Sequence, residues 1–165
     1  MFAHSASATA EVVAATAACG RPRWAKLSPN AADLPEIAAA AAAAGAEAVT
    51  LVNTALGMVI DVETRRPVLG GGGGGVSGPA IHPIAVRAVH DCRVALPHLP
   101  IVGVGGVATG EDAVELLLAG ANAVQVGTAS FADPHAVERV LDELIDWCRR
   151  HGIRRVSELI GGAHG

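Results

Sequence analysis

The chain has 165 residues, enough for one domain with a substantial hydrophobic core. Only 2% of the residues are aromatic while 51% are hydrophobic, so Ala, Val, Leu and Ile must build that core. The net charge of -4 argues against a nucleic-acid-binding protein, because such proteins usually carry a clustered basic face.

Short apolar runs alternate with helical patterns along the whole chain. The predicted elements, in chain order, are a helix over 10–20, a strand over 23–27, a helix over 33–45, a strand over 47–53, a helix over 81–96, a strand over 100–106, a helix over 109–121, a strand over 122–128, a helix over 133–152 and a short helix over 157–160. Three of the helices have a predicted N-cap, at Asp33, Thr109 and Asp133.

The order of these elements predicts an α/β fold. The strand runs are continuous rather than alternating, which is typical of parallel strands covered on both faces. Either a doubly wound sheet or a (β/α)8 barrel would fit the alternation. A barrel needs about 250 residues and eight strands. The four predicted strands would therefore make half of a barrel.

Residues 54–80 interrupt the alternation as a glycine-rich insertion. The stretch 58–69 predicts a small hairpin with its turn at 63–66. Six consecutive glycines follow at 70–75. They are consistent with a low-complexity linker and equally with an active-site loop on the rim of the sheet.

Glycine-rich loops end the last two predicted strands. Gly105 and Gly106 in "VGVGGVATGEDA" allow close backbone approach, and the following helix would add a positive dipole. Gly127 and Thr128 end the next strand. Each loop alone usually serves only the turn, but the pair resembles the phosphate site that barrels build after strands seven and eight. The spacing does not match the GxGxxG dinucleotide fingerprint.

Polar residues end the first two strands. Lys26 is the only lysine of the chain and sits in the apolar run "WAKL". It is either an edge lysine that extends to water or a contact for an anion at the mouth of the sheet. Asn53 and Thr54 can hydrogen-bond a planar polar ligand, or can simply form the turn.

The remaining chemistry-bearing residues indicate no second site. The three cysteines, Cys19, Cys92 and Cys148, are odd in number and widely spaced, which fits buried thiols in a reducing cytoplasm and no metal site. The histidines are scattered and are interpreted as surface or packing residues. The N-terminus lacks a signal peptide pattern, and the longest alanine run is too short to span a bilayer, so we expect a cytoplasmic protein without a membrane span.

Several motifs together resemble dihydroorotate dehydrogenase, in particular the class 1, NAD-linked catalytic subunit. They are "AKLSPN", "LVNTALGM", "VSGPAIHPIAVR", "PIVGVGGVATGEDAVELLLAGANAVQVGTASFADP" and the final "ELI". The related subunit of dihydropyrimidine dehydrogenase shares much of this pattern. The resemblance implies that residues 1–165 are one partial domain, the C-terminal half (about strands five to eight) of an FMN-binding (β/α)8 TIM barrel.

The resemblance also implies a function and a role for each site residue. The family oxidises dihydroorotate to orotate in pyrimidine (UMP) biosynthesis, with FMN as the cofactor. Lys26 would lie beside the flavin and stabilise its reduced form, and Asn53 and Thr54 would bind the substrate. The remaining implied FMN contacts are Val52, Gly78, Gly105, Gly106, Gly127 and Thr128. The family subtype implies an FAD and iron–sulfur electron-transfer subunit, and a homodimer or heterotetramer when complete.

Two departures from the family pattern limit the expected activity. The catalytic cysteine motif of the family, Asn-x-Ser-Cys-Pro-Asn, is absent, so the base is expected upstream of Met1. The glycine run also replaces a more varied family stretch, and only Gly74 and Gly75 match it. We therefore expect a chain that is inactive alone. The alternative is a non-catalytic relic, or a half-barrel that binds phosphorylated ligands.

Overall fold

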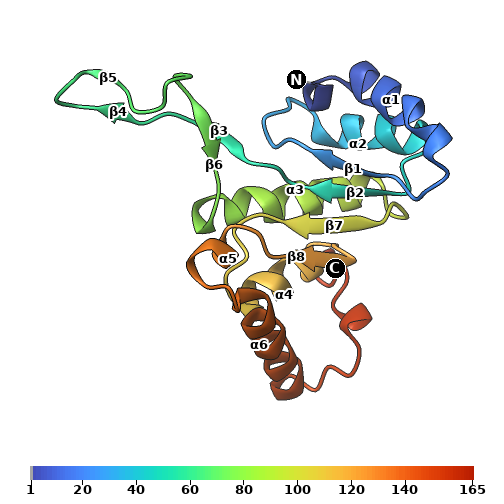
Figure 1. Ribbon diagram of the computed structural model, residues 1–165. Helices are drawn as coiled ribbons and strands as arrows, with labels where there is room; N and C mark the ends of the chain where they lie inside the picture. The colour runs from blue at the N-terminus through green and yellow to red at the C-terminus, as the bar shows by residue number, and fades with distance from the viewer. Residues whose placement is uncertain (1) are drawn as a thin grey trace.

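The computed structural model describes residues 2–165, and its central element is a four-stranded parallel sheet (Figure 1). The strands are β1 (Trp24–Leu27), β2 (Ala48–Leu51), β7 (Ile101–Val104) and β8 (Ala123–Gln125), in the order β1-β2-β7-β8. One register row across the sheet joins Lys26, Thr50, Val102 and Ala123. The predicted α/β fold with a parallel sheet is thus confirmed, and successive units lie side by side.

Helices connect the strands. They are α1 (Ala6–Ala15), α2 (Leu34–Ala43), α3 (His82–Ala95), α4 (Gly110–Leu118), α5 (Ala129–Ala132) and α6 (Ala136–Arg150), with short 3-10 turns η1 (Phe2–His4), η2 (Ala17–Cys19), η3 (Pro79–Ile81) and η4 (Val156–Glu158). Asp33 caps α2 through the Glu36 N–H at 2.9 Å, and Thr109 forms a reciprocal capping box with Asp112. These two predicted caps are confirmed.

Two predicted helix boundaries are wrong. The first helix starts at Ala6 behind an N-cap at Ser5, and Gly20 ends the separate turn η2 with φ +61°. The last long helix starts at Ala136 rather than near Pro134. Asp133 ends the short helix α5, and its carboxylate accepts from the His135 N–H at 2.9 Å. Asp133, which the sequence predicted to be an N-cap, therefore lies in the linker between α5 and α6.

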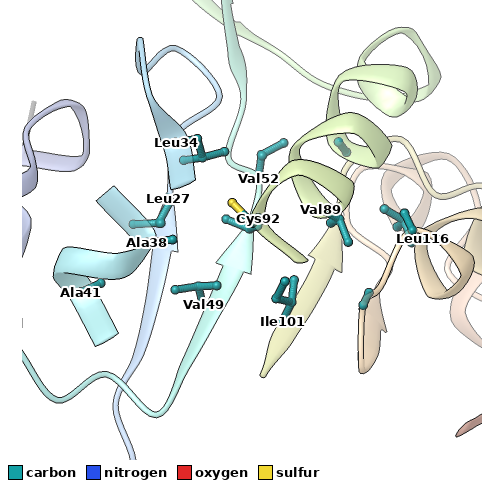
Figure 2. Close-up of a cluster of buried hydrophobic side chains, with 14 of the residues drawn as sticks. Leu27, Leu34, Ala38, Ala41, Val49, Val52, Val89, Cys92, Ile101 and Leu116 are labelled. Carbon is teal, nitrogen blue, oxygen red and sulfur yellow. The ribbon is translucent and has the colours of Figure 1, made fainter. Parts of the chain in front are cut away.

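The core lies between one face of the sheet and the helices (Figure 2). Leu27, Val49 and Ile101 are buried there against Ala38 of α2 and Val89 of α3, among other apolar side chains. The opposite face is open at its edges: Trp24 is 60% exposed, and β1 and β8 alternate between exposed and covered residues. Only β2 and β7 are buried at every position. The prediction that the strands are covered on both faces is thus confirmed for the central strands β2 and β7 and is wrong for β1 and β8.

The insertion between β2 and α3 forms an arm that projects away from the sheet (Figure 1). At its base β3 (Ala55–Gly57) pairs antiparallel with β6 (Gly74–Val76), and further out β4 (Ile60–Asp61) pairs antiparallel with β5 (Arg66–Pro67). Two of the six consecutive glycines thus lie in a strand. Within the described part of the chain, no helix is long and apolar enough to cross a membrane.

Candidate functional site

One cavity of about 420 Å³ lies at the carboxyl ends of the parallel strands. Its walls come from β1, from the loops that follow β2, β7 and β8, and from the segment that joins the arm to α3. The structure brings all the sequence-predicted site residues to this cavity: Lys26, Val52, Asn53, Thr54, Gly78, Gly105, Gly106, Gly127 and Thr128. Segments as far apart in the chain as β1 and α5 meet here.

Lys26 is exposed and lies in β1 next to Thr50 of β2, on the face of the sheet opposite the helices. The neighbouring residue Leu27 points into the core instead. Among residues 2–165, no ion pair includes Lys26. Its ammonium charge at the cavity wall is therefore not neutralised by this part of the protein.

The loop after β2 is tied down by its backbone. Val52 N–H donates to the Val104 carbonyl at 2.7 Å, and Asn53 N–H donates to the Leu27 carbonyl at 2.8 Å. The Asn30 side chain adds a second constraint: its amide nitrogen donates to the Thr54 carbonyl at 3.0 Å, and its oxygen accepts from the Leu56 N–H at 2.8 Å. These contacts leave the Asn53 side chain exposed at the cavity.

The glycines after β7 are required by the backbone and by their neighbours. Gly105 and Gly106 have φ values of +142° and +72°. A Cβ at Gly105 would lie 2.7 Å from the Ala85 Cβ, and one at Gly106 would lie 2.7 Å from the His82 Cβ. The loop therefore packs tightly onto the start of α3, where only glycine fits without strain.

In the loops after β7 and β8, five backbone N–H groups of cavity-lining residues have no acceptor within residues 2–165. They belong to Gly105, Gly106, Val107, Gly127 and Thr128. Gly105 and Val107 are buried and Gly106 is half-buried, and N–H groups without a partner are uncommon in such places, whereas Gly127 and Thr128 are exposed. Free N–H groups from two adjacent loops are the arrangement that binds phosphate and other anions.

The start of α4 does not supply the free dipole expected from the sequence. Asp112 accepts from the N–H groups of Ala108 and Thr109 at 2.9 and 2.8 Å, and Glu143 accepts from the Gly110 N–H at 2.7 Å. Burial acts to raise the pKa of Asp112, but these hydrogen bonds leave that pKa below its usual value. Two carboxylates thus already occupy this helix end, so the N–H groups that remain without a partner are those of the loops.

Arg139 and Asp133 also line the cavity and were missed by the sequence analysis. Arg139 donates to the Ala108 carbonyl at 2.9 Å and pairs with Glu143 at 3.0 Å and Asp133 at 3.2 Å. The hydrogen bond from Gly110 and the pair with Arg139 hold the pKa of Glu143 below its ordinary value. In the sequence these charges belong to an amphipathic helix, which gives no signal that they return to the loop after β7.

His82 was interpreted as a surface or packing residue, but it lies 7% exposed directly behind the Gly105 loop. Its Nδ1 is 2.8 Å from the Gly105 carbonyl oxygen, and its Nε2 is 3.0 Å from a Glu115 carboxylate oxygen. No spacing rule links residues 82, 105 and 115, so only the fold reveals this contact.

The cysteines lie away from the cavity. Cys92 is buried, and burial raises the pKa of its thiol to about 12, while Cys19 is exposed and Cys148 is half-buried. The expectation of buried thiols therefore holds for Cys92 but is wrong for Cys19. Across residues 2–165, no group of three or more His, Cys, Asp or Glu side chains is placed to hold a metal ion.

The family model and the most similar curated proteins that we compared point to the same family. The family model described as dihydroorotate dehydrogenase matches residues 1–147. A relative from Desulforudis audaxviator, named dihydroorotate dehydrogenase B (NAD(+)), catalytic subunit, is 52% identical over 87% of this chain and 46% of its own length. A relative from Solibacter usitatus, named as a dihydroorotate dehydrogenase A (fumarate), is 48% identical over 97% of this chain and 53% of its own length.

A solved structure agrees with these sequence matches. The crystal structure of the Eimeria tenella DHODH in complex with ferulenol superposes with a TM-score of 0.72 at 30% identity, over 87% of this chain and 39% of that one. The chain spans about half the length of the curated relatives it matches. By its sequence and by its fold, the chain belongs to the dihydroorotate dehydrogenase family.

Proposed function

We propose that this chain is the FMN-binding, C-terminal half of a (β/α)8 barrel, about strands five to eight, in one partial domain over 1–165. Joined to the complementary half, it would oxidise dihydroorotate to orotate in pyrimidine biosynthesis. The observation that carries this proposal is the cavity around which all the family-matched residues gather. The helices on one face of the sheet and the opposite face that is open along the edge strands β1 and β8 are what half of such a barrel would present.

The cavity fits the phosphate end of FMN. Five unpartnered N–H groups belong to residues of the loops after β7 and β8 that line the cavity, and no carboxylate of the described residues is bonded to them. Gly105 and Gly106 keep the wall free of side chains, and Gly78 lines the cavity next to Gly106. The cavity volume of about 420 Å³ lies within the range of about 300 to 1,000 Å³ found for cofactor sites.

The remaining side chains suit the ring and the substrate. Lys26 would place a positive charge beside the flavin, where it would stabilise negative charge on the reduced ring. The Val52 backbone would contact the cofactor. The Asn53 amide and Thr54 hydroxyl offer donors and acceptors for a pyrimidine and its carboxylate. FMN, when bound, supplies the capacity to accept a hydride.

The described residues lack a free catalytic base in the cavity. The titratable side chains that line it are Lys26, Asp133 and Arg139, and the last two are paired with each other. Asp133 accepts hydrogen bonds from His135 and Arg139, which lower its pKa and weaken it as a base. We therefore expect the base to come from the complementary half, and we expect no turnover by the chain alone.

The proposed assembly follows the names of the relatives. A "catalytic subunit" name implies a separate partner, for which we propose an FAD and iron–sulfur electron-transfer subunit, in a heterotetramer or homodimer in the cytoplasm. The relative named for fumarate matches at a similar identity, so the electron acceptor is a point for experiment. The relatives carry dihydroorotate dehydrogenase names, which favours this reading over the dihydropyrimidine dehydrogenase subunit.

One observation favours a second function, a non-catalytic half-barrel that binds phosphorylated ligands. The unpartnered N–H groups and the lysine lie within this chain, whereas the described residues of the cavity offer no free base. Such a module would bind FMN or another phosphorylated ligand without oxidising dihydroorotate. The two functions differ in whether adding the complementary half produces chemistry.

The test combines the chain with that half. The purified chain is titrated with FMN alone, and then after co-expression with the N-terminal half of the Desulforudis audaxviator relative. We expect weak FMN binding and no turnover by the chain alone, and flavin absorbance that dihydroorotate bleaches in the assembled pair. A Lys26→Ala pair serves as the control for site-specific reduction. Tight FMN binding without bleaching in a stoichiometric, folded pair would favour the binding module, and turnover by the chain alone would contradict the proposed division of the site.

A further inference from the structure

His82 is the first residue of α3 and lies behind the loop after β7. Its ring bridges two elements, since Nδ1 is 2.8 Å from the Gly105 carbonyl oxygen and Nε2 is 3.0 Å from Glu115 of α4. Asp112, also of α4, lies 3.7 Å from the same Nε2. These two carboxylates are the charged groups that pair with the ring within residues 2–165.

Both contacts of the ring are to acceptors. A backbone carbonyl can only accept, and the Glu115 side chain, 61% exposed, presents its carboxylate to solvent. The hydrogen bond to Gly105 is therefore donated by the Nδ1–H group of the ring.

The bond to Gly105 sets the direction of the next N–H. In a trans peptide the C=O and N–H groups point in opposite directions, and the Gly105–Gly106 peptide is trans. Because the Gly105 carbonyl points at His82, the Gly106 N–H points away from it. That N–H is one of the unpartnered groups of the cavity loops.

We propose that His82 is a positioning residue for anion binding: its Nδ1–H anchors the Gly105 carbonyl and so presents the Gly106 N–H to the phosphate group of the ligand. This inference rests on the proposed FMN site and adds a residue that never touches the ligand. It predicts an effect on phosphate recognition and none on recognition of the flavin ring.

The test uses the full chain and two probes that differ by one phosphate. Amide NMR titrations with inorganic phosphate follow Gly105, Gly106, Gly127 and Thr128, and fluorescence titrations compare FMN with riboflavin. We expect His82→Met to weaken phosphate and FMN binding up to about tenfold, the loss expected for one hydrogen bond, and to leave riboflavin binding unchanged. His82→Lys, which keeps an N–H donor at this position, is expected to restore most of the affinity.

The controls separate this inference from the proposed function. His90→Met changes a half-buried histidine of the same helix and is expected to leave all three titrations unchanged. If the unaltered chain shows no phosphate-dependent shift at the loop amides, the proposed cofactor site itself is wrong. If it shows the shift and both His82 variants bind phosphate like the unaltered chain, the positioning role is wrong. Ring ¹⁵N shifts of His82 in the unaltered chain give a readout that needs no variant, and an unprotonated Nδ1 at neutral pH would also overturn the inference.

Discussion

Replacing Gly106 by alanine tests whether the loop after β7 is held as tightly as its geometry indicates. Its φ of +72° costs a residue with a Cβ about 1–2 kcal/mol. The new Cβ would also lie 2.7 Å from the His82 Cβ and 2.9 Å from the Gly78 carbonyl oxygen. Relieving such crowding costs about 1–3 kcal/mol. Alanine restricts the unfolded chain and returns about 0.4–1 kcal/mol. We expect a net loss of roughly 2–4 kcal/mol.

Two other glycines separate the contributions. Gly20 has φ +61° but no atom within 4 Å of the position that a Cβ would take, so Gly20→Ala isolates the backbone cost, about 1 kcal/mol net. Gly127 lacks a positive φ and also has open space, so Gly127→Ala is expected to be neutral or slightly stabilising. The assay is equilibrium urea unfolding of the three variants beside the unaltered chain. Equal free energies of unfolding for Gly106→Ala and Gly20→Ala would refute the packing argument.

Three further outcomes follow from the site and its surroundings. Lys26→Ala is expected to change the free energy of unfolding by less than about 0.5 kcal/mol, because the side chain is exposed. The same variant is expected to bind FMN roughly tenfold more weakly or worse, and equal FMN affinity would contradict the role of Lys26 in the cavity. Asp112 has a lowered pKa, so it stabilises the fold above the usual carboxyl pKa of about 4 and loses this effect as the pH falls. Between pH 7 and pH 3, the unfolding temperature of Asp112→Asn is expected to fall less than that of the unaltered chain. Parallel plots of unfolding temperature against pH would count against this stabilisation by Asp112. Iodoacetamide is expected to label Cys19 in the native protein and Cys92 only after denaturation, as mass spectrometry of the peptides would show; native labelling of Cys92 would mean that the α3 contact with the sheet opens.

Much of the fold could be predicted from local sequence patterns. Asp33 and Thr109 stand at the starts of their helices because a short oxygen-bearing side chain can satisfy a free backbone N–H there. The parallel sheet follows from apolar runs separated by helical patterns. The predicted start of α6 was wrong because Asp133 accepts from the His135 N–H in a turn, and the sequence pattern alone cannot distinguish such a turn from a helix N-cap.

The site divides in the same way. Residues at strand ends, such as Lys26 and Gly105, could be predicted because parallel strands bring their carboxyl ends to one edge. The residues that support the loop could not be predicted, because Arg139 and His82 bond its backbone carbonyls from helices distant from it in sequence. The one-sided cover of β1 was also hidden, because Trp24 is apolar in the sequence yet 60% exposed in the structure.

The pairing of β3 with β6 determines how much of the arm the cavity depends on. Thr54 directly precedes β3 and Gly78 follows shortly after β6, so the ladder joins the two chain segments that line the cavity. Loop-closure entropy grows only slowly with length, by about 0.6 kcal/mol per doubling. The segment between Gly57 and Gly74 can therefore be lengthened or shortened at little thermodynamic cost, while the β3–β6 ladder keeps the two cavity-lining segments at the same distance. The tip of the arm can thus change in sequence and length without changing the cavity.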